Sequence, residues 1–142
     1  MAILLSPVNL QKVEFDATTA EGQCRVTIVT GSAWVQPSGL RANAPTVNAL
    51  QQRASYKVLV DPTLAPGKFR KATATVSASG WAGTTNSIPS LTSFQIEDAE
   101  ATFDDEAGQV QLIVDILVEA DGTNNISQWF GCNFQVTTLA VV

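Results

Sequence analysis

The sequence predicts an all-β protein, an antiparallel, jelly-roll-like β-sandwich of about seven to nine strands with one short helix. The strongest of three observations is the stretch from Ser93 to Glu119, where apolar and polar residues alternate on both sides of a short acidic segment. Every second residue from Val110 to Val118 is apolar, the spacing that lines one face of a strand. The other two observations are the frequent turn residues and the presence of only one segment with helical periodicity.

The stretch from Ser93 to Glu119 is expected to form a long hairpin that is central to the domain. Its loop, Asp104 to Gly108, ends in glycine, which is compatible with a hairpin loop of that length. The apolar residues of the first arm change parity near Asp98, which predicts a β-bulge there. We therefore expect two long paired strands, the first of which contains a bulge.

A second hairpin is predicted near the N-terminus, with arms from Lys12 to Asp16 and from Gln23 to Thr30 and a polar loop between them. The Phe-Asp pair before this loop and the glycine at its end are repeated around the loop of the long hairpin. This echo is too short to establish a duplication. It predicts two similar hairpins, one in each sheet.

The remaining elements are shorter or less regular. A helix is predicted from Pro45 to Ala54, because proline opens the segment and Val47, Leu50 and Ala54 follow at helical spacing. The segment from Gly80 to Leu91 is expected to be a flexible loop that carries Trp81. Extended segments are expected at Ile3 to Leu10 with a break at Pro7, Ala33 to Gln36, Tyr56 to Val60, Phe69 to Ser79, and Trp129 to Val142 with a bulge at Gly131.

A β-trefoil is the alternative fold. Trp34, Trp81 and Trp129 are separated by 47 and 48 residues, and each follows a serine two positions earlier. A threefold repeat of that length would suit a trefoil. The other positions do not align across the three blocks, and the alternating arms of the long hairpin exceed the usual length of trefoil strands. The sandwich is therefore favoured.

Length and composition fit one domain that spans residues 1–142. No apolar run approaches the roughly 18 residues of a membrane span. Residues Ala2 to Leu5 lack a basic flank, so they are not expected to act as a secretory signal. We expect a soluble chain with no membrane partner, made in the cytoplasm or already freed from a signal, and belonging to a virion or an extracellular assembly.

Charge is divided unevenly along the chain. All eight basic residues lie in the first 71 positions, whereas the second half carries nine acidic residues and no basic one. The halves have formal charges of about +4 and −9, which give the net charge of −5. A net acidic chain is a poor candidate for nucleic acid, whose binding depends on neutralised phosphates. The division predicts pairing of the halves within the fold or head-to-tail attraction between copies.

The chain contains no histidine, which removes the Ser-His-Asp and Cys-His arrangements and the commonest ligand of catalytic zinc or iron. We predict a protein that is not an enzyme and uses no cofactor. Cys24 and Cys132 fall in predicted strands and are interpreted as buried thiols. The alternative is a disulfide between the N- and C-terminal strands, which would imply an oxidising compartment.

Two groups of residues are candidate binding sites. Asp104, Asp105 and Glu106 could supply oxygen ligands to calcium, although such a run is more often a solvated hairpin tip. Trp81 and Asn86, in a loop rich in Gly and Thr, are suited to stack on and hydrogen-bond a sugar ring. Trp34 and Trp129 are further candidates of this kind, but we interpret them in the first place as core or interface residues.

The leading functional hypothesis is a non-enzymatic subunit or accessory of a homo-oligomeric assembly, such as a phage capsid or tail component or a surface filament. Low-charge strands rich in Thr, Ala and Gln favour this hypothesis, as do the segregated charge and the apolar termini. Ala2 to Leu5 and Leu139 to Val142 would suit strand exchange between copies, unless they are outer strands of the chain's own sheets. The alternative function is a carbohydrate-binding module that uses exposed tryptophan.

Overall fold

The computed structural model describes residues 2–20, 22–35, 50–83, 91–120 and 128–142, and these residues form eight β-strands. The strands are β1 (Ile3–Leu5), β2 (Val8–Thr19), β3 (Gly22–Val35), β4 (Leu50–Thr63), β5 (Phe69–Gly83), β6 (Leu91–Asp104), β7 (Gln109–Ala120) and β8 (Gln128–Val141). Within these ranges, nothing forms a helix long and apolar enough to cross a bilayer.

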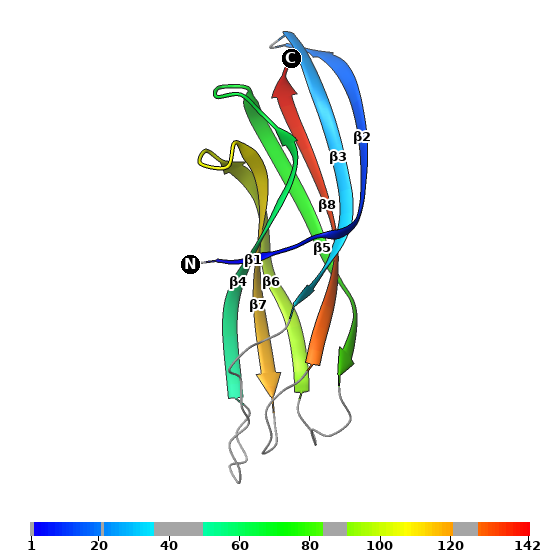
Figure 1. The fold of residues 1–142 in the computed structure, drawn as a ribbon, viewed down its shortest axis with the longest axis vertical. Helices are drawn as coiled ribbons and strands as arrows, with labels where there is room; N and C mark the ends of the chain where they lie inside the picture. The colour runs from blue at the N-terminus through cyan, green and yellow to red at the C-terminus, as the bar shows by residue number, and fades with distance from the viewer. Residues whose placement is uncertain (1, 21, 36–49, 84–90, 121–127) are drawn as a thin grey trace.

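The strands form two four-stranded sheets that pack face to face (Figure 1). Sheet A has the order β1-β4-β7-β6, and sheet B has the order β2-β3-β8-β5. Neighbouring strands are antiparallel except for β1, which runs parallel to β4. The predicted β-sandwich is confirmed, and the alternative trefoil is not the fold of this chain.

Both predicted hairpins are present, and they lie in different sheets. The N-terminal hairpin is β2–β3 in sheet B, and the long hairpin is β6–β7 in sheet A. The predicted bulge in the long hairpin is confirmed by a register shift between Ile96 and Asp98. The bulge predicted at Gly131 instead lies in the partner strand, because the register of β5 against β8 shifts between Ala78 and Gly80.

The predicted helix from Pro45 to Ala54 is wrong for the part that lies within the described residues, because that part is a strand. Leu50 to Ala54 belong to β4, in register with Ala120 to Ile116 of β7, and 45–49 lie outside the described residues. Pairing with β7 therefore overrides the helical spacing. Trp81 likewise belongs to β5, which continues to Gly83 through part of the predicted loop.

The core lies between the sheets and is filled by alternate residues of the strands. From β7 it receives Val110, Leu112, Val114 and Ile116, and from β8 it receives Cys132, Phe134 and Val136. Two stacked aromatic pairs connect the sheets. Phe69 stacks on Phe103 with 5.5 Å between ring centroids, and Phe94 stacks on Phe130 at 4.3 Å. These contacts fix sheet B against β6 of sheet A.

Two glycines of sheet B each lie opposite an aromatic residue on the neighbouring strand. Gly31 pairs with Phe134, and Gly131 pairs with Trp34. A Cβ atom at Gly31 would lie 2.8 Å from Cζ of Phe134 and 2.8 Å from Cδ2 of Leu10. A Cβ atom at Gly131 would lie 3.5 Å from the Trp34 ring and 2.5 Å from Oγ of Ser79. The aromatic rings thus occupy the space that the missing side chains leave.

The two cysteines are buried and free. Cys24 is in register with Val141, whereas Cys132 is in register with Ala33. Val141 and Cys132 are nine positions apart on β8, which is about 30 Å at the usual rise of a strand. The two cysteines are therefore far beyond the reach of a disulfide. The two thiols therefore do not form a disulfide with each other, and burial raises the pKa of Cys132 to about 11.

Two ion pairs join a base of the first half to an acid of the second. Nε of Arg53 lies 3.0 Å from Oε1 of Glu97, and Nζ of Lys57 lies 2.9 Å from Oδ2 of Asp104. Both pairs connect β4 to β6 across the central strand β7. The predicted pairing of the charged halves thus accounts for part of the charge division.

Replacing Gly31 by alanine is expected to lower the free energy of unfolding by about 1–3 kcal/mol, because the new methyl group would collide with the buried Phe134 ring. Ser77→Ala is the matched control. Ser77 is exposed on the outer face of the same sheet, so its loss is expected to cost about 0.5 kcal/mol or less. Urea unfolding of both variants measures the difference. Equal stability of the two variants would contradict the role of Gly31.

Candidate functional site

The outer face of sheet B carries a hollow of about 450 Å³ that is lined by all four strands of the sheet. All of its polar side chains are uncharged. The amides are Asn9, Gln11, Asn133 and Gln135. The hydroxyls are Thr30, Ser32, Thr75 and Ser77. We call this surface the polar hollow. It offers hydrogen-bond donors and acceptors without a formal charge.

The polar side chains line up because the strands of sheet B pair in register. We call a row of residues that are paired across the sheet a rung. One rung consists of Gln11, Thr30, Gln135 and Thr75. The next rung on the same face contains Ser32, Asn133 and Ser77. Rungs on one face are about 7 Å apart, and four strands span about 14 Å. The polar hollow is therefore broad enough to receive a chain of small polar units.

A hydrogen bond within the polar hollow orients one of the amides. Oγ of Ser32 donates to Oδ1 of Asn133, with 2.8 Å between the two oxygens. This bond uses the carbonyl side of the Asn133 amide. The Nδ2 group is then left to donate to a ligand.

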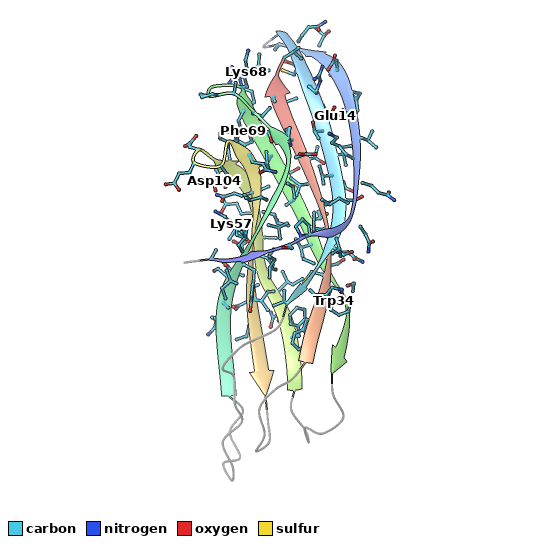
Figure 2. The ribbon with its side chains drawn as sticks, in the orientation of Figure 1. Glu14, Trp34, Lys57, Lys68, Phe69 and Asp104 are labelled. Atoms are coloured by element: carbon cyan, nitrogen blue, oxygen red, sulfur yellow. The ribbon has the colours of Figure 1, made fainter. Side chains whose placement is uncertain are left out.

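Trp34 lies one rung beyond Ser32 on the outer face of sheet B (Figure 2). Its residue surface is 46% exposed, which is unusual for a large aromatic side chain. The ring reaches over the neighbouring strand β8, because its Cη2 and Cζ3 atoms lie 3.5 Å from the Cβ position at Gly131. The exposed aromatic surface therefore adjoins the polar hollow.

The edge strand β2 is a second candidate surface, because it pairs with β3 on one side only. None of its residues is buried, and no strand of the described residues pairs with its outer side. Its exposed apolar side chains include Val13, 60% exposed, and Phe15, 49% exposed. An uncovered strand of twelve residues presents a row of unpaired backbone groups.

Charged residues occupy the core-facing side of β2. Lys12 is opposite the buried Val29, and Glu14 is opposite the buried Thr27. Nζ of Lys12 lies 3.6 Å from Glu14 and 3.4 Å from Asp61 of sheet A. The nearby carboxylates raise the pKa of Lys12, and the effect of Asp61 is larger than that of Glu14. Inward-facing charges of this kind discourage indiscriminate pairing of an edge strand.

No family model, no curated protein and no solved structure matches this chain. Its function therefore has to be inferred from the polar hollow, Trp34 and β2.

The structure brings together the three tryptophan positions that the sequence singles out. Trp34 is in register with Gly131, Trp81 with Phe130, and Trp129 with Ala82, so all three lie at one end of β3, β8 and β5. The side chains of Trp81 and Trp129 lie outside the described part of the structure, as does the whole of Asn86. Trp34 is exposed and is not a core residue.

The acidic loop that the sequence offered as a calcium site has another structural role. Oδ1 of Asp104 accepts hydrogen bonds from the backbone N–H groups of Glu106 at 3.0 Å and Ala107 at 3.2 Å. Its Oδ2 accepts from Lys57, which lies beside it in Figure 2. Asp105 and Glu106 are exposed. In the described ranges, no group of three or more potential ligands is placed to hold a metal ion.

The polar hollow was not predicted from the sequence. Polar residues stand two positions apart in the sequence, at Thr30 and Ser32 and again at Asn133 and Gln135. This spacing shows that one face of each strand is polar. Nothing local shows that these residues share rungs with Gln11. The sequence thus shows the polar face of each strand, but it does not show how the strands pair with one another.

Acid is expected to weaken the fold through Asp104. The hydrogen bond from Lys57, followed by that from the Ala107 backbone, holds the pKa of the Asp104 carboxyl below its usual range. The stabilisation is complete above the ordinary carboxyl pKa of about 3.9 and is lost as pH falls through the lower folded value. Asp104→Asn should therefore be less stable at pH 7 and lose less stability between about pH 5 and 2.

The measurement is the urea midpoint as a function of pH. Asp105→Asn is the control, because it removes the same charge from the same loop without breaking the contact with Lys57. If the two variants lost stability alike in acid, the stabilising contact of Asp104 with Lys57 would be excluded.

Proposed function

We propose that this protein is a non-enzymatic, self-assembling subunit, and that its β2 strand pairs with β2 of a second copy. The observation that carries the proposal is the position of β2 at the edge of sheet B, where Val8 to Asp16 are exposed. Antiparallel pairing of two such edges would satisfy their open backbone groups and join two sheets into one. A two-fold axis between identical strands gives this geometry without any further element.

Charge selects one register for the pairing. A two-fold axis normal to the sheet places one residue of β2 opposite itself in the second copy. With Val13 at that position, Lys12 of each copy faces Glu14 of the other, so two opposite-charge pairs form. A register centred on Lys12 or Glu14 would place like charges opposite each other. Centring on Phe15 would place Glu14 opposite Asp16.

The same charges favour a second copy over an unrelated strand. Lys12 and Glu14 lie on the side of β2 that faces the core layer, and an unrelated apolar strand would add no charged partner to the pairs that Lys12 makes with Glu14 and Asp61. A second β2 supplies both partners at once. Val13 of one copy then contacts Val13 of the other on the outer face. In the single chain this residue is 60% exposed, so the contact would bury apolar surface.

The terminal segments do not need to be exchanged between copies. Ile3 to Leu5 pair with β4 of the same chain, and Leu139 to Val141 belong to β8 in the interior of sheet B. These are the places of ordinary strands in the chain's own sheets. The β2 pairing yields a dimer, and a larger assembly of the capsid, tail or filament kind would add head-to-tail contacts between the oppositely charged halves.

A disulfide trap tests the register directly. Val13→Cys is expected to form a covalent dimer on mild oxidation, because the two Cα atoms would be about 4.5–5.5 Å apart across the axis, within disulfide range. The native cysteines are buried and do not compete. Phe15→Cys is the matched control, since its two copies would be about 13 Å apart. Non-reducing electrophoresis compares them, and equal cross-linking would refute the Val13-centred register.

Charge reversal tests the electrostatic part of the proposal. Lys12→Glu is expected to shift the wild-type dimer to monomer, because each copy would then place like charges opposite Glu14. The double variant Lys12→Glu/Glu14→Lys restores opposite charges across the interface and is expected to restore the dimer. Light scattering after size exclusion measures the mass. A wild type that is monomeric at low salt would overturn the proposal.

Salt separates the charge contribution from the backbone and apolar contributions. Near 1 M salt the Debye length is about 3 Å, so the two surface charge pairs are largely screened. Dimerisation of the wild type is expected to weaken there, and that of the uncharged double variant Lys12→Gln/Glu14→Gln is expected to change less. An unchanged wild-type affinity at high salt would show that the charge pairs do not set the register.

A further inference from the structure

The polar hollow has the chemistry of a site for an uncharged ligand. Its polar side chains are four amides and four hydroxyls, and none of the described residues that line it is charged. A phosphate or a carboxylate would find no cation among these residues, so its desolvation would be poorly compensated. A ligand with many hydroxyl groups can both donate to and accept from amides and hydroxyls.

Trp34 adds an aromatic surface to one end of the polar hollow. The ring lies over Gly131, where any larger residue would meet Oγ of Ser79 at 2.5 Å from its Cβ position. Glycine at this position therefore allows the indole to lie against the sheet while the residue stays 46% exposed. Such a ring can receive the apolar face of a flat, polar molecule.

The spacing of these features suits a chain of repeating units. Trp34 occupies the rung next to Ser32 and Asn133, and the rung of Gln135 follows on the same face. Successive rungs are about 7 Å apart. A ligand that stacks on Trp34 would therefore meet amide and hydroxyl groups over its next units, along the strand direction.

We propose that Trp34 and the polar hollow bind a neutral carbohydrate chain on the outer face of sheet B. One sugar ring stacks on Trp34, Nδ2 of Asn133 donates to a hydroxyl of the ligand, and Gln135 contacts the following unit. The site includes Asn9 and Gln11 of β2 but uses the outer face of the sheet, whereas the proposed pairing uses the backbone edge of β2. Dimerisation and carbohydrate binding can therefore fail independently.

The test is native affinity electrophoresis in gels that contain one soluble neutral polysaccharide each: a mixed-linkage β-glucan, a xylan or a galactomannan. Wild-type protein is expected to be retarded by at least one of them and not by anionic polygalacturonate. Trp34→Ala is expected to weaken the interaction about tenfold, from the loss of ring stacking. Gln135→Ala is expected to weaken it severalfold, from the loss of a hydrogen bond.

Two control variants separate the site from general surface effects. Gln95→Ala removes an exposed amide from β6 of sheet A, and Leu4→Ala removes an exposed apolar side chain from β1. Both are expected to bind as wild type does. Gln135 is exposed and distant from the core, so Gln135→Ala decides the question if Trp34→Ala does not fold.

Three results would overturn the proposal. The first is the absence of retardation by all three neutral polysaccharides, and the second is wild-type binding by folded Gln135→Ala. The third is an equal loss of binding in Gln95→Ala, which would place the interaction elsewhere. Retardation that is lost in Gln135→Ala and kept in both controls supports the site.

Discussion

The pairing of β3 with β8 is the constraint on which the rest of the structure depends. Its register runs without a shift from Cys24 opposite Val141 to Val35 opposite Phe130. A slip by one residue would turn Phe134 and Val136 toward solvent and bring Asn133 and Gln135 into the core. The same register sets Phe134 over Gly31 and Trp34 over Gly131. Core and outer face are thus fixed by one set of contacts between segments about a hundred residues apart in sequence.

Local patterns were sufficient to predict the fold class and both hairpins. The alternation in β6 and β7 and the parity change near Asp98 involve neighbouring residues, so the sequence carries them directly. The segment Leu50 to Ala54 was predicted incorrectly because its apolar spacing also fits a helix. Its pairing with β7, which is distant in the sequence, decides in favour of a strand.

The candidate site could be predicted only in part. The sequence placed the main exposed tryptophan on the loop with Trp81 and Asn86. Trp34, which was interpreted first as a core or interface residue, is exposed. The polar hollow combines Gln11 from one end of the chain with Gln135 from the other, and no local rule reports that adjacency. The edge position of β2 is equally non-local. Its charged residues at Lys12 and Glu14, where a buried strand would be apolar, were the available sign.

The two proposals meet in β2, which supplies Gln11 and Asn9 to the polar hollow and is also the strand proposed to pair. An axis normal to the sheet leaves the outer faces of both copies on the same side. Two polar hollows would then lie side by side on one continuous eight-stranded sheet, with β2 of each copy between them. A carbohydrate chain long enough to reach both would bind the second as an intramolecular event, so weak single-site affinity would be multiplied. Pairing through any surface that turned the two faces apart would lose this gain. The position of the edge strand therefore connects assembly to the strength of binding.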